Sequence, residues 1–415
     1  MSASNMAGSG QANTAWAEPR MYPLLAVTYY AFVFSIVFDI PEKGIPVELH
    51  TITGCAFLLA SFFQPGICYR RIPQAALWFG LYWGVYLIQT ITSDHLDEAL
   101  KRCAQFPLLV VLFCASYNVM QAEHVARNTL VAILLSCFVL ACVQHSGIAN
   151  FVGASEAGRY GERDTVLGQN PNFLALHMVL GIIAAIALRG NKAAPLAVPG
   201  FVLLVMIMLM ALSIIRSGSR AAILALVVGL VTLQLRKETG SSRLRTGLVA
   251  VAALAFVVVS AFLSESMRAR LEASMETGDM AKRELIYPAS RDMILERPVL
   301  GWGPVDNNYQ LAARVPRADL PTRETHNVVL EVLSETGIVG ALPFLIAVGL
   351  CLRGAWIGRH GPFGIPWLAL TAAVLVGKMA SAGIYLKMHW LVLAAALACG
   401  NRFITHSRED SQAPM

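Results

Sequence analysis

The feature that most constrains how this chain can fold is a series of long apolar segments separated by short polar ones. Several segments have about 17 residues, the lower limit for a helix that crosses a bilayer. Apolar residues make up 56% of the chain and charged residues only 14%, against roughly 25% charged residues in soluble domains. This composition excludes a soluble globular domain and a disordered chain. The apolar segments are 22–40, 47–63, 75–91, 104–119, 129–149, 172–188, 195–215, 219–235, 246–263, 327–352, 364–385 and 388–404.

These segments predict an all-α polytopic membrane protein with about 12 transmembrane helices and one long, partly helical periplasmic loop. The first twenty residues contain no basic residue before Arg20, so we expect a retained first span rather than a signal peptide. With a cytoplasmic N-terminus, the inner loops carry fourteen Lys and Arg residues and the short outer loops carry nine. The positive-inside rule therefore favours this orientation. The predicted regions are a cytoplasmic tail 1–21, helices one to nine within 22–263, a periplasmic loop 264–326, helices ten to twelve within 327–404, and a cytoplasmic tail 405–415.

The predicted loop 264–326 is the one long hydrophilic segment, and it is too long for a plain connection. Helical patterns occur inside it, for example over 281–296, where Pro298 follows the helix end. We therefore predict a functional loop with two or more short amphipathic helices that lie over the site.

Several function classes are excluded by what the chain lacks. The net charge of +6 is not gathered in a basic cluster with interleaved aromatic residues, so nucleic acid is not an expected partner. Most of the eight cysteines lie in apolar segments, without metal-ligand spacing. No phosphate-binding loop or other nucleotide motif is present. We therefore expect no metal and no cofactor.

The first candidate for chemistry is His326, where the long loop meets the tenth predicted span. A histidine at the water interface can act as a general base. The alternative is a histidine that only makes local hydrogen bonds, with Thr325 or Asn327 capping the helix. Glu331 and Glu335 follow on the same helix. Ionisable residues within a span usually face a cavity or a partner, and the alternative is that they neutralise nearby arginines.

The second candidate is a set of arginines on the predicted outer side, where the positive-inside rule does not favour them. Guanidinium groups suit bidentate binding of phosphates, so the set indicates an anion site for a lipid-linked pyrophosphate. The alternative is pairing with acidic residues such as Glu162, Asp164, Glu284 or Asp292. The arginines are Arg159, Arg163, Arg216, Arg220, Arg283, Arg291 and Arg297.

Several short motifs occur in a definite order between about 160 and 340. Two of them are Arg163 before Gly-Gln-Asn-Pro-Asn and Ser219-Arg220-Ala221. The later ones are Arg283, Tyr287, Ser290, Pro298-Val-Leu-Gly-Trp-Gly303, His326-Asn327, Leu330, Glu335 and Gly337-Ile-Val-Gly340. Their order and spacing resemble the signature region of the O-antigen ligase and O-antigen polymerase superfamily, with Tyr287 where the family usually has tryptophan.

The resemblance implies a multi-pass glycosyltransferase of the GT-C type in the bacterial inner membrane, with a periplasmic active site. For the ligase branch, it implies transfer of O-antigen from undecaprenyl pyrophosphate to a sugar hydroxyl of lipid A–core oligosaccharide, without a metal. His326 would be the catalytic base, and Arg163, Arg220 and Arg283 would bind the pyrophosphate. Arg159, Arg216, Arg291 and Asn327 are weaker candidates for the site.

Two enzyme alternatives use the same donor: an O-antigen polymerase and a protein O-oligosaccharyltransferase. The motifs do not separate these acceptors. A non-enzyme alternative is a transporter of lipid-linked glycan. Transporters often show paired, interrupted helices in two halves and ionisable residues near mid-membrane, whereas the arginines of this chain gather at one predicted face.

Overall fold

The computed structural model describes residues 21–38, 49–147, 150–152, 164–166, 169–189, 198–235, 241–263, 268, 272, 275–276, 282–315, 321–381 and 383–412. In the N-terminal half, helices follow one another along the chain, with one small pair of strands. These elements are α1 (Pro23–Ser35), α2 (Leu49–Phe62), α3 (Pro65–Cys68), α4 (Gln74–Ile91), α5 (Leu96–Val119), α6 (Glu123–Ser146), β1 (Asn150–Val152), β2 (Asp164–Val166) and α8 (Pro171–Arg189).

The C-terminal half is helical throughout its described elements, and two of its helices belong to the predicted loop. These two, α13 and α14, confirm helical structure within 264–326. The elements are α9 (Gly200–Ser217), α10 (Arg220–Leu233), α11 (Ser241–Leu263), α13 (Arg283–Glu296), α14 (Asp306–Arg314), α15 (Val328–Gly358), α16 (Gly364–Lys378) and α17 (Lys387–Gln412).

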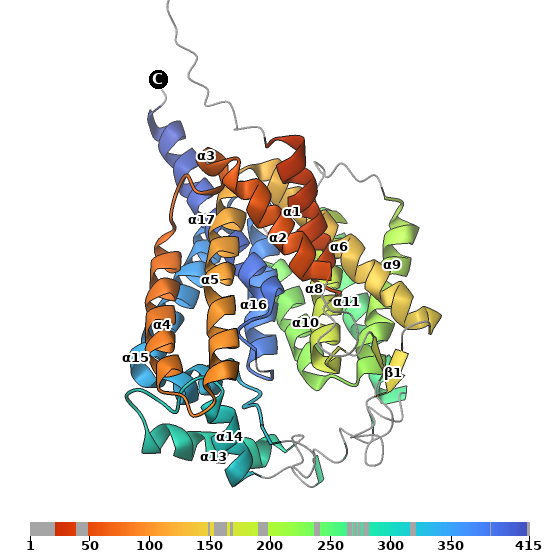
Figure 1. The fold of residues 1–415 in the computed structure, drawn as a ribbon. Helices are drawn as coiled ribbons and strands as arrows, with labels where there is room; N and C mark the ends of the chain where they lie inside the picture. Colours follow the sequence, from red (N-terminus) through yellow and green to blue (C-terminus); the bar gives the residue numbers. More distant parts are fainter. Residues whose placement is uncertain are drawn as a thin grey trace, which may run out of the picture.

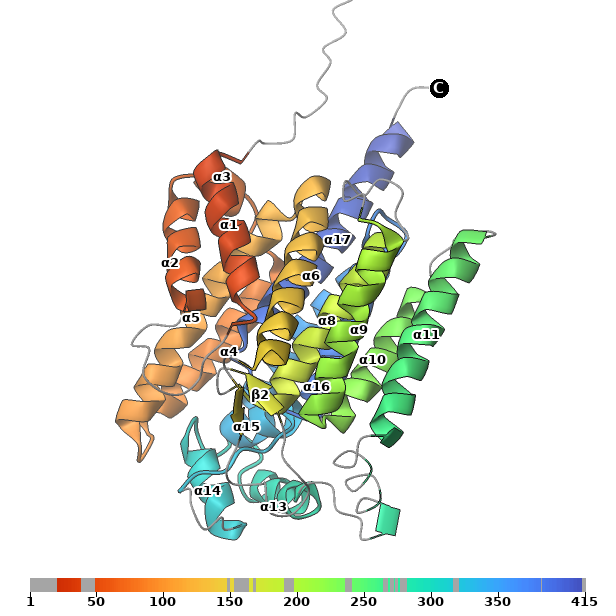
Figure 2. The ribbon, with the colours of Figure 1, turned by 90° about the vertical axis from the view of Figure 1, so that its right-hand side faces the viewer.

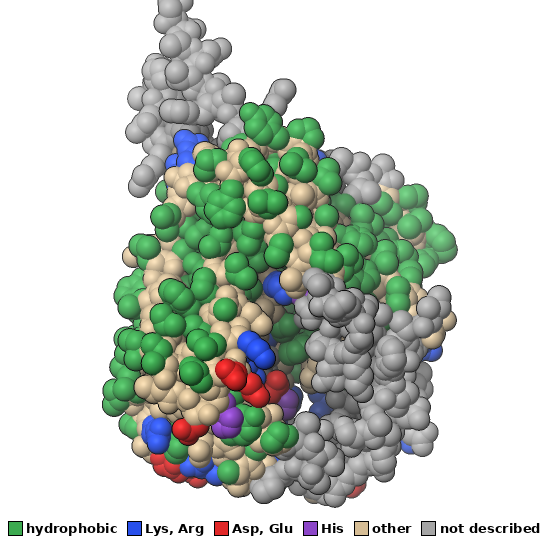
Figure 3. Space-filling view, in the orientation of Figure 1, with side chains coloured by type: hydrophobic (Ala, Val, Ile, Leu, Met, Phe, Trp, Pro, Cys, Tyr) green, Lys and Arg blue, Asp and Glu red, His purple; other side chains and the backbone are tan. Residues whose placement is uncertain are grey.

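Every predicted apolar segment coincides with a helix, and the chain is a multi-pass membrane protein. Five helices are long and apolar enough to cross a membrane: α5, α6, α8, α9 and α15. Shorter apolar helices accompany them, so the number of twelve spans stays a prediction. Figure 3 shows hydrophobic side chains over the upper and middle parts of one face, with most acidic and histidine side chains at its lower end. Such a wide exposed apolar surface is what a lipid environment requires.

The helices run alternately between the two ends of the bundle, and α13 and α14 cover one end (Figures 1 and 2). Helices α8, α10 and α15 all begin at that covered end, whereas α1 begins and α17 ends at the opposite one. Helix α8 is the most buried of the long apolar helices.

An aromatic cluster packs α4, α5, α15 and α17 together. Its central ring, Phe79 of α4, lies 4.5 Å from the Trp390 ring and 5.7 Å from the Phe344 ring, measured between centroids. Offset and edge contacts of this kind add to the packing energy of the apolar surface. The cluster gives α15 a fixed position beside three other helices.

The predicted all-α class is confirmed. Two details go beyond the prediction, and the first is a small antiparallel sheet of β1 and β2, in which Phe151 pairs with Thr165. Strands of three residues leave too short an alternating pattern to be found in a sequence. Helix α17 continues to Gln412, beyond the predicted span end at residue 404, because a helix can extend past the hydrocarbon core.

Helix α15 is broken at Gly337, and the turn between α13 and α14 docks into the break. Gly337 has φ 57° and ψ −164°, a conformation that is open essentially to glycine alone. The Ile338 and Val339 amides donate to the carbonyls of Pro298 and Val299, at 2.9 and 3.2 Å. The Trp302 and Gly303 amides donate in return to carbonyls of α15, at 2.8 and 2.9 Å.

The close approach of the two backbones explains the glycines of the family-like motif. A Cβ at Gly337 would lie 2.3 Å from the Val299 carbonyl oxygen, and a Cβ at Gly301 would lie 2.6 Å from the Glu335 carbonyl oxygen. These contacts are too short for any side chain. The segment Pro298–Gly303 is therefore a structural clasp that ties the loop helices to the start of α15.

Candidate active site

His326 lies directly before Asn327, the N-cap of α15, at the end of the bundle that α13 and α14 cover. Its φ is 51°, in a region that non-glycine residues seldom adopt and that is often found at functional sites. The imidazole is 34% exposed, and its Nδ1 lies 3.8 Å from a Glu324 carboxylate oxygen. The ring is therefore accessible to a substrate and has a carboxylate beside it.

Asn327 caps α15 and joins the helix to the connection between α16 and α17. Its side-chain oxygen accepts hydrogen bonds from the Val329 and Leu330 amides, at 2.9 and 3.2 Å, as an N-cap asparagine should. Its side-chain nitrogen donates to the Met379 carbonyl at 3.2 Å. Of the two capping residues that the sequence suggested, Asn327 is the cap, and Thr325 donates to the Asn327 carbonyl at 3.1 Å.

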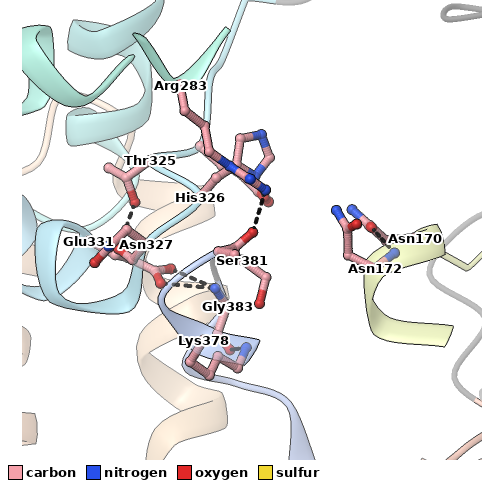
Figure 4. A network of polar contacts seen from close by, with 12 residues as sticks. Asn170, Asn172, Arg283, Thr325, His326, Asn327, Glu331, Lys378, Ser381 and Gly383 are labelled. Carbon is pink, nitrogen blue, oxygen red and sulfur yellow. Dashed lines mark hydrogen bonds and ion pairs between the residues drawn. The ribbon is translucent and has the colours of Figure 1, made fainter. Parts of the chain in front are cut away.

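Helix α13 brings Arg283, which Figure 4 shows, and Tyr287 to the same connection. Arg283 Nη2 donates to the Ala380 carbonyl at 2.6 Å, while its buried Nε has no hydrogen-bond partner within the described chain. The Tyr287 hydroxyl lies 3.3 Å from the Met379 carbonyl and 3.4 Å from the His326 carbonyl. Arg283 and His326, predicted separately from the sequence, are thus neighbours in the structure.

The residues between α16 and α17, 379–386, are named here the α16–α17 connection, and Gly383 lies at its centre. The buried Glu331 carboxylate accepts the Gly383 amide, at 2.9 and 3.2 Å from its two oxygens. Lys378 Nζ donates to the Gly383 carbonyl at 2.6 Å and lies 5.1 Å from the centroid of the Phe173 ring on α8. The Glu331 carboxylate therefore has a backbone partner, the Gly383 amide, in addition to any arginine that it neutralises.

Glu335, one turn further along α15, has a different environment. It is fully buried, and one carboxylate oxygen lies 3.5 Å from the Tyr82 hydroxyl. Arg102 of α5 is close enough to interact electrostatically with both Glu331 and Glu335. The alternative that these glutamates balance a nearby arginine therefore has structural support.

Asn170 and Asn172 stand opposite this group at the start of α8. Figure 4 shows their side chains directed across a gap toward Arg283, His326 and Lys378. Asn170 accepts the Asn172 amide through its side-chain oxygen at 2.9 Å, which caps the N-terminus of α8. Both asparagines belong to the Gly-Gln-Asn-Pro-Asn motif. This motif therefore faces Arg283 and His326, although it lies far from them in the sequence.

The other predicted arginines have different surroundings. Arg163 and Arg159 lie outside the described residues. Arg220 is the half-buried first residue of α10, directly after the N-cap Ser219, at the covered end of the bundle. Arg216 is exposed and donates to His145 Nδ1 at 3.0 Å. Arg291 is exposed on α13.

Arg297 stacks on the clasp. Its guanidinium lies 4.0 Å from the centroid of the Trp302 ring, and Arg314 lies 5.0 Å from the same ring. The Trp302 indole N–H donates to the Met293 carbonyl at 2.8 Å. Trp302 is thus enclosed by cations and by α13, which stiffens the loop helices against the clasp.

Lys378 is the residue of this site that the sequence prediction missed. It lies inside the predicted apolar segment 364–385, where a lysine is costly unless it has partners, and this position is the sequence signal that could have found it. In the structure its side chain is buried. Within the described residues, no group of three or more His, Cys, Asp or Glu side chains is placed to hold a metal ion.

Comparison with protein families gives this geometry a context. The family model described as O-Antigen ligase matches residues 205–345, about a third of the chain. This region is therefore similar to the O-antigen ligase family. The matched region contains Arg220, Arg283, the clasp and His326. Members of the family are glycosyltransferase-like ligases and polymerases, and the similarity therefore supports the general prediction that this protein is an enzyme. No curated protein matches the chain significantly.

Asn170, Lys378 and Gly383 lie outside the matched O-antigen ligase region, yet the structure brings them to the residues inside it. The site is therefore built from both parts of the chain. Lipid-linked glycan and membrane lipid are the substrates that the family implies in general.

Proposed function

We propose that this protein is an O-antigen ligase, which transfers O-antigen from undecaprenyl pyrophosphate to a sugar hydroxyl of lipid A–core oligosaccharide. The observation that carries the proposal is the accessible His326 beside Arg283 at the start of α15, inside the region that matches the O-antigen ligase family. In the proposed orientation, this end of the bundle faces the periplasm of a bacterial inner membrane, and the fold is of the GT-C type.

In the proposed reaction, His326 accepts the proton of the acceptor hydroxyl as its oxygen attacks the anomeric carbon. The bond from that carbon to the pyrophosphate breaks on the opposite side, so the configuration inverts. The neighbouring Glu324 carboxylate, 3.8 Å from the imidazole, stabilises the imidazolium that forms. No metal or cofactor takes part in this scheme.

The leaving pyrophosphate gains negative charge, and Arg163, Arg220 and Arg283 are the groups proposed to bind it. Arg283 uses Nη2 for the Ala380 carbonyl, so its remaining N–H groups are the ones available to a phosphate oxygen. Removing one such preorganised charge typically lowers the rate by about 10²–10³. Asn170 and Asn172 face the same space and support the proposal as neutral donors.

The test is transfer by the purified protein in detergent or proteoliposomes, with His326→Ala against the wild type. We expect His326→Ala to bind the lipid-linked donor but to lose transfer by at least about 10². A matched control is His360→Ala, because His360 is an exposed histidine just beyond the other end of α15. Wild-type transfer by His326→Ala would refute the base assignment.

The acceptor distinguishes the ligase from its enzyme alternatives. The same assay is run with lipid A–core, with a second lipid-linked repeat, and with a pilin-like protein as acceptor. Transfer to lipid A–core alone supports the ligase, whereas transfer to the second repeat or to the protein indicates a polymerase or a protein O-oligosaccharyltransferase. Donor movement across a bilayer without transfer to any acceptor would indicate a transporter.

A further inference from the structure

The α16–α17 connection is the common partner of the residues around His326. Asn327 and Tyr287 contact the Met379 carbonyl, and Arg283 donates to the Ala380 carbonyl. These three side chains come from two different elements, α13 and the start of α15. Any shift of the connection would therefore move the base and the arginine relative to each other.

The connection is irregular backbone beside membrane-spanning helices, where unpaired backbone groups are costly. Several of its backbone groups are paired with side chains. The Trp390 indole donates to the Ile384 carbonyl at 2.7 Å, and the Tyr385 hydroxyl bonds to that of Tyr86 on α4. At the centre, Gly383 has φ 100°, so neither helix geometry nor a side chain of its own holds it in place.

Gly383 is held by Glu331 and Lys378 through both of its backbone polar groups. Glu331 accepts its N–H and Lys378 donates to its carbonyl. Glu331 projects from α15, one turn after the N-cap Asn327, and Lys378 is the last residue of α16. The two side chains bring a negative and a positive charge to one glycine from two helices, and both are more than nine-tenths buried.

We propose that Glu331 and Lys378 are positioning residues for the transferase centre. Together they fix Gly383, and through it the connection that holds Arg283 and the His326–Asn327 pair. Neither residue touches the reacting atoms. This inference rests on the proposed function, and it adds two residues whose role is to set the geometry of base and arginine.

The test uses full-length protein with Glu331→Leu, which keeps the volume but removes the acceptor, and Glu331→Gln, which keeps one acceptor oxygen. Lys378→Met removes the donor from the other side. The control is Thr371→Val on α16, because Thr371 is fully buried and its hydroxyl donates only within its own helix, to the Trp367 carbonyl. Two quantities are measured: amide hydrogen exchange of a peptide covering 379–386, and kcat and KM for transfer.

We expect Glu331→Leu to raise the exchange rate of the Gly383 amide by about tenfold or more. A displacement of about 1 Å at a reacting group lowers the rate by about 10², so kcat should fall by about that factor while KM for the donor stays within about twofold. Glu331→Gln should restore most of both quantities. The double variant with Lys378→Met should be no worse than the more damaging single one, because both act on Gly383.

Faster exchange in Glu331→Leu with a wild-type kcat would overturn the positioning role, and so would an equal loss of kcat in Thr371→Val. The exchange measurement needs no substrate and therefore reports on the contact with Gly383 whatever the reaction is. Failure of the wild type to transfer glycan to any acceptor would instead refute the proposed function, and the positioning role with it.

Discussion

The docking of the clasp into the break of α15 leads to a sharp prediction for Gly337→Ala. Alanine at φ 57° and ψ −164° costs about 1–3 kcal/mol in backbone conformation. Its Cβ would lie 2.3–2.6 Å from three backbone atoms of Val299 and Leu300, so the clasp must move away. The hydrogen bonds of the Ile338 and Val339 amides are then lost, at about 0.5–1.5 kcal/mol each.

Together these effects amount to about 2–6 kcal/mol for release of the clasp. We measure them by amide exchange at Trp302 and Gly303, whose N–H groups donate to α15 carbonyls. A loss of 2 kcal/mol corresponds to an exchange rate about 30-fold higher. Transfer should also fall strongly, because Arg283 reaches the site from the helix that leads into the clasp.

Gly349→Ala is the matched control on the same helix. A Cβ at Gly349 would meet no heavy atom within 4 Å, and alanine is favoured over glycine in a helix by about 0.5–1 kcal/mol. Exchange at Trp302 in this control should equal that of the wild type. If Gly337→Ala exchanged as slowly as Gly349→Ala, the claim that the clasp requires a glycine at this position would be refuted.

The remaining predictions concern the cap, the arginine and the indole. Asn327→Ala should lower thermal stability by about 0.5–2 kcal/mol through loss of the cap, whereas Asn327→Asp should keep the cap and lose only the contact to Met379; thermal unfolding in detergent compares them. Arg283→Lys should still donate to the Ala380 carbonyl but should lower transfer by about 10² if the guanidinium binds pyrophosphate; wild-type transfer would contradict this role. Trp302→Phe removes one hydrogen bond and should destabilise by about 1 kcal/mol, measured in the same unfolding assay.

The helices could be predicted from the sequence because lipid imposes a simple rule on each of them separately. Any apolar stretch of sufficient length must pair its backbone internally, whatever its neighbours are. The same holds for local features such as the helix of α13 before Pro298 and the Asn327 cap, since their partners lie within a few residues. All of these predictions are confirmed by the structure.

The site could be predicted only in part, because its decisive contacts join residues far apart in the chain. Glu331 and Gly383 are 52 positions apart, and no local pattern shows that a glutamate and a glycine amide will meet. Arg283 was expected to bind an anion, but the structure also gives it a carbonyl partner at Ala380. Short polar motifs therefore indicated candidate residues, while their partners could be found only from the fold.

The partners of the family-like residues suggest a reason why so many of them occur around one histidine. A membrane protein that carries out chemistry beside its spans needs non-helical backbone there, at the clasp and at the α16–α17 connection. Each such stretch leaves amides and carbonyls that must be paired, since unpaired groups are costly in that environment. Glycines 301 and 337 allow backbone to pair with backbone, whereas Glu331 and Asn327 pair with backbone through side chains. These contacts fix the backbone next to His326, whose imidazole is 34% exposed and can therefore meet a substrate.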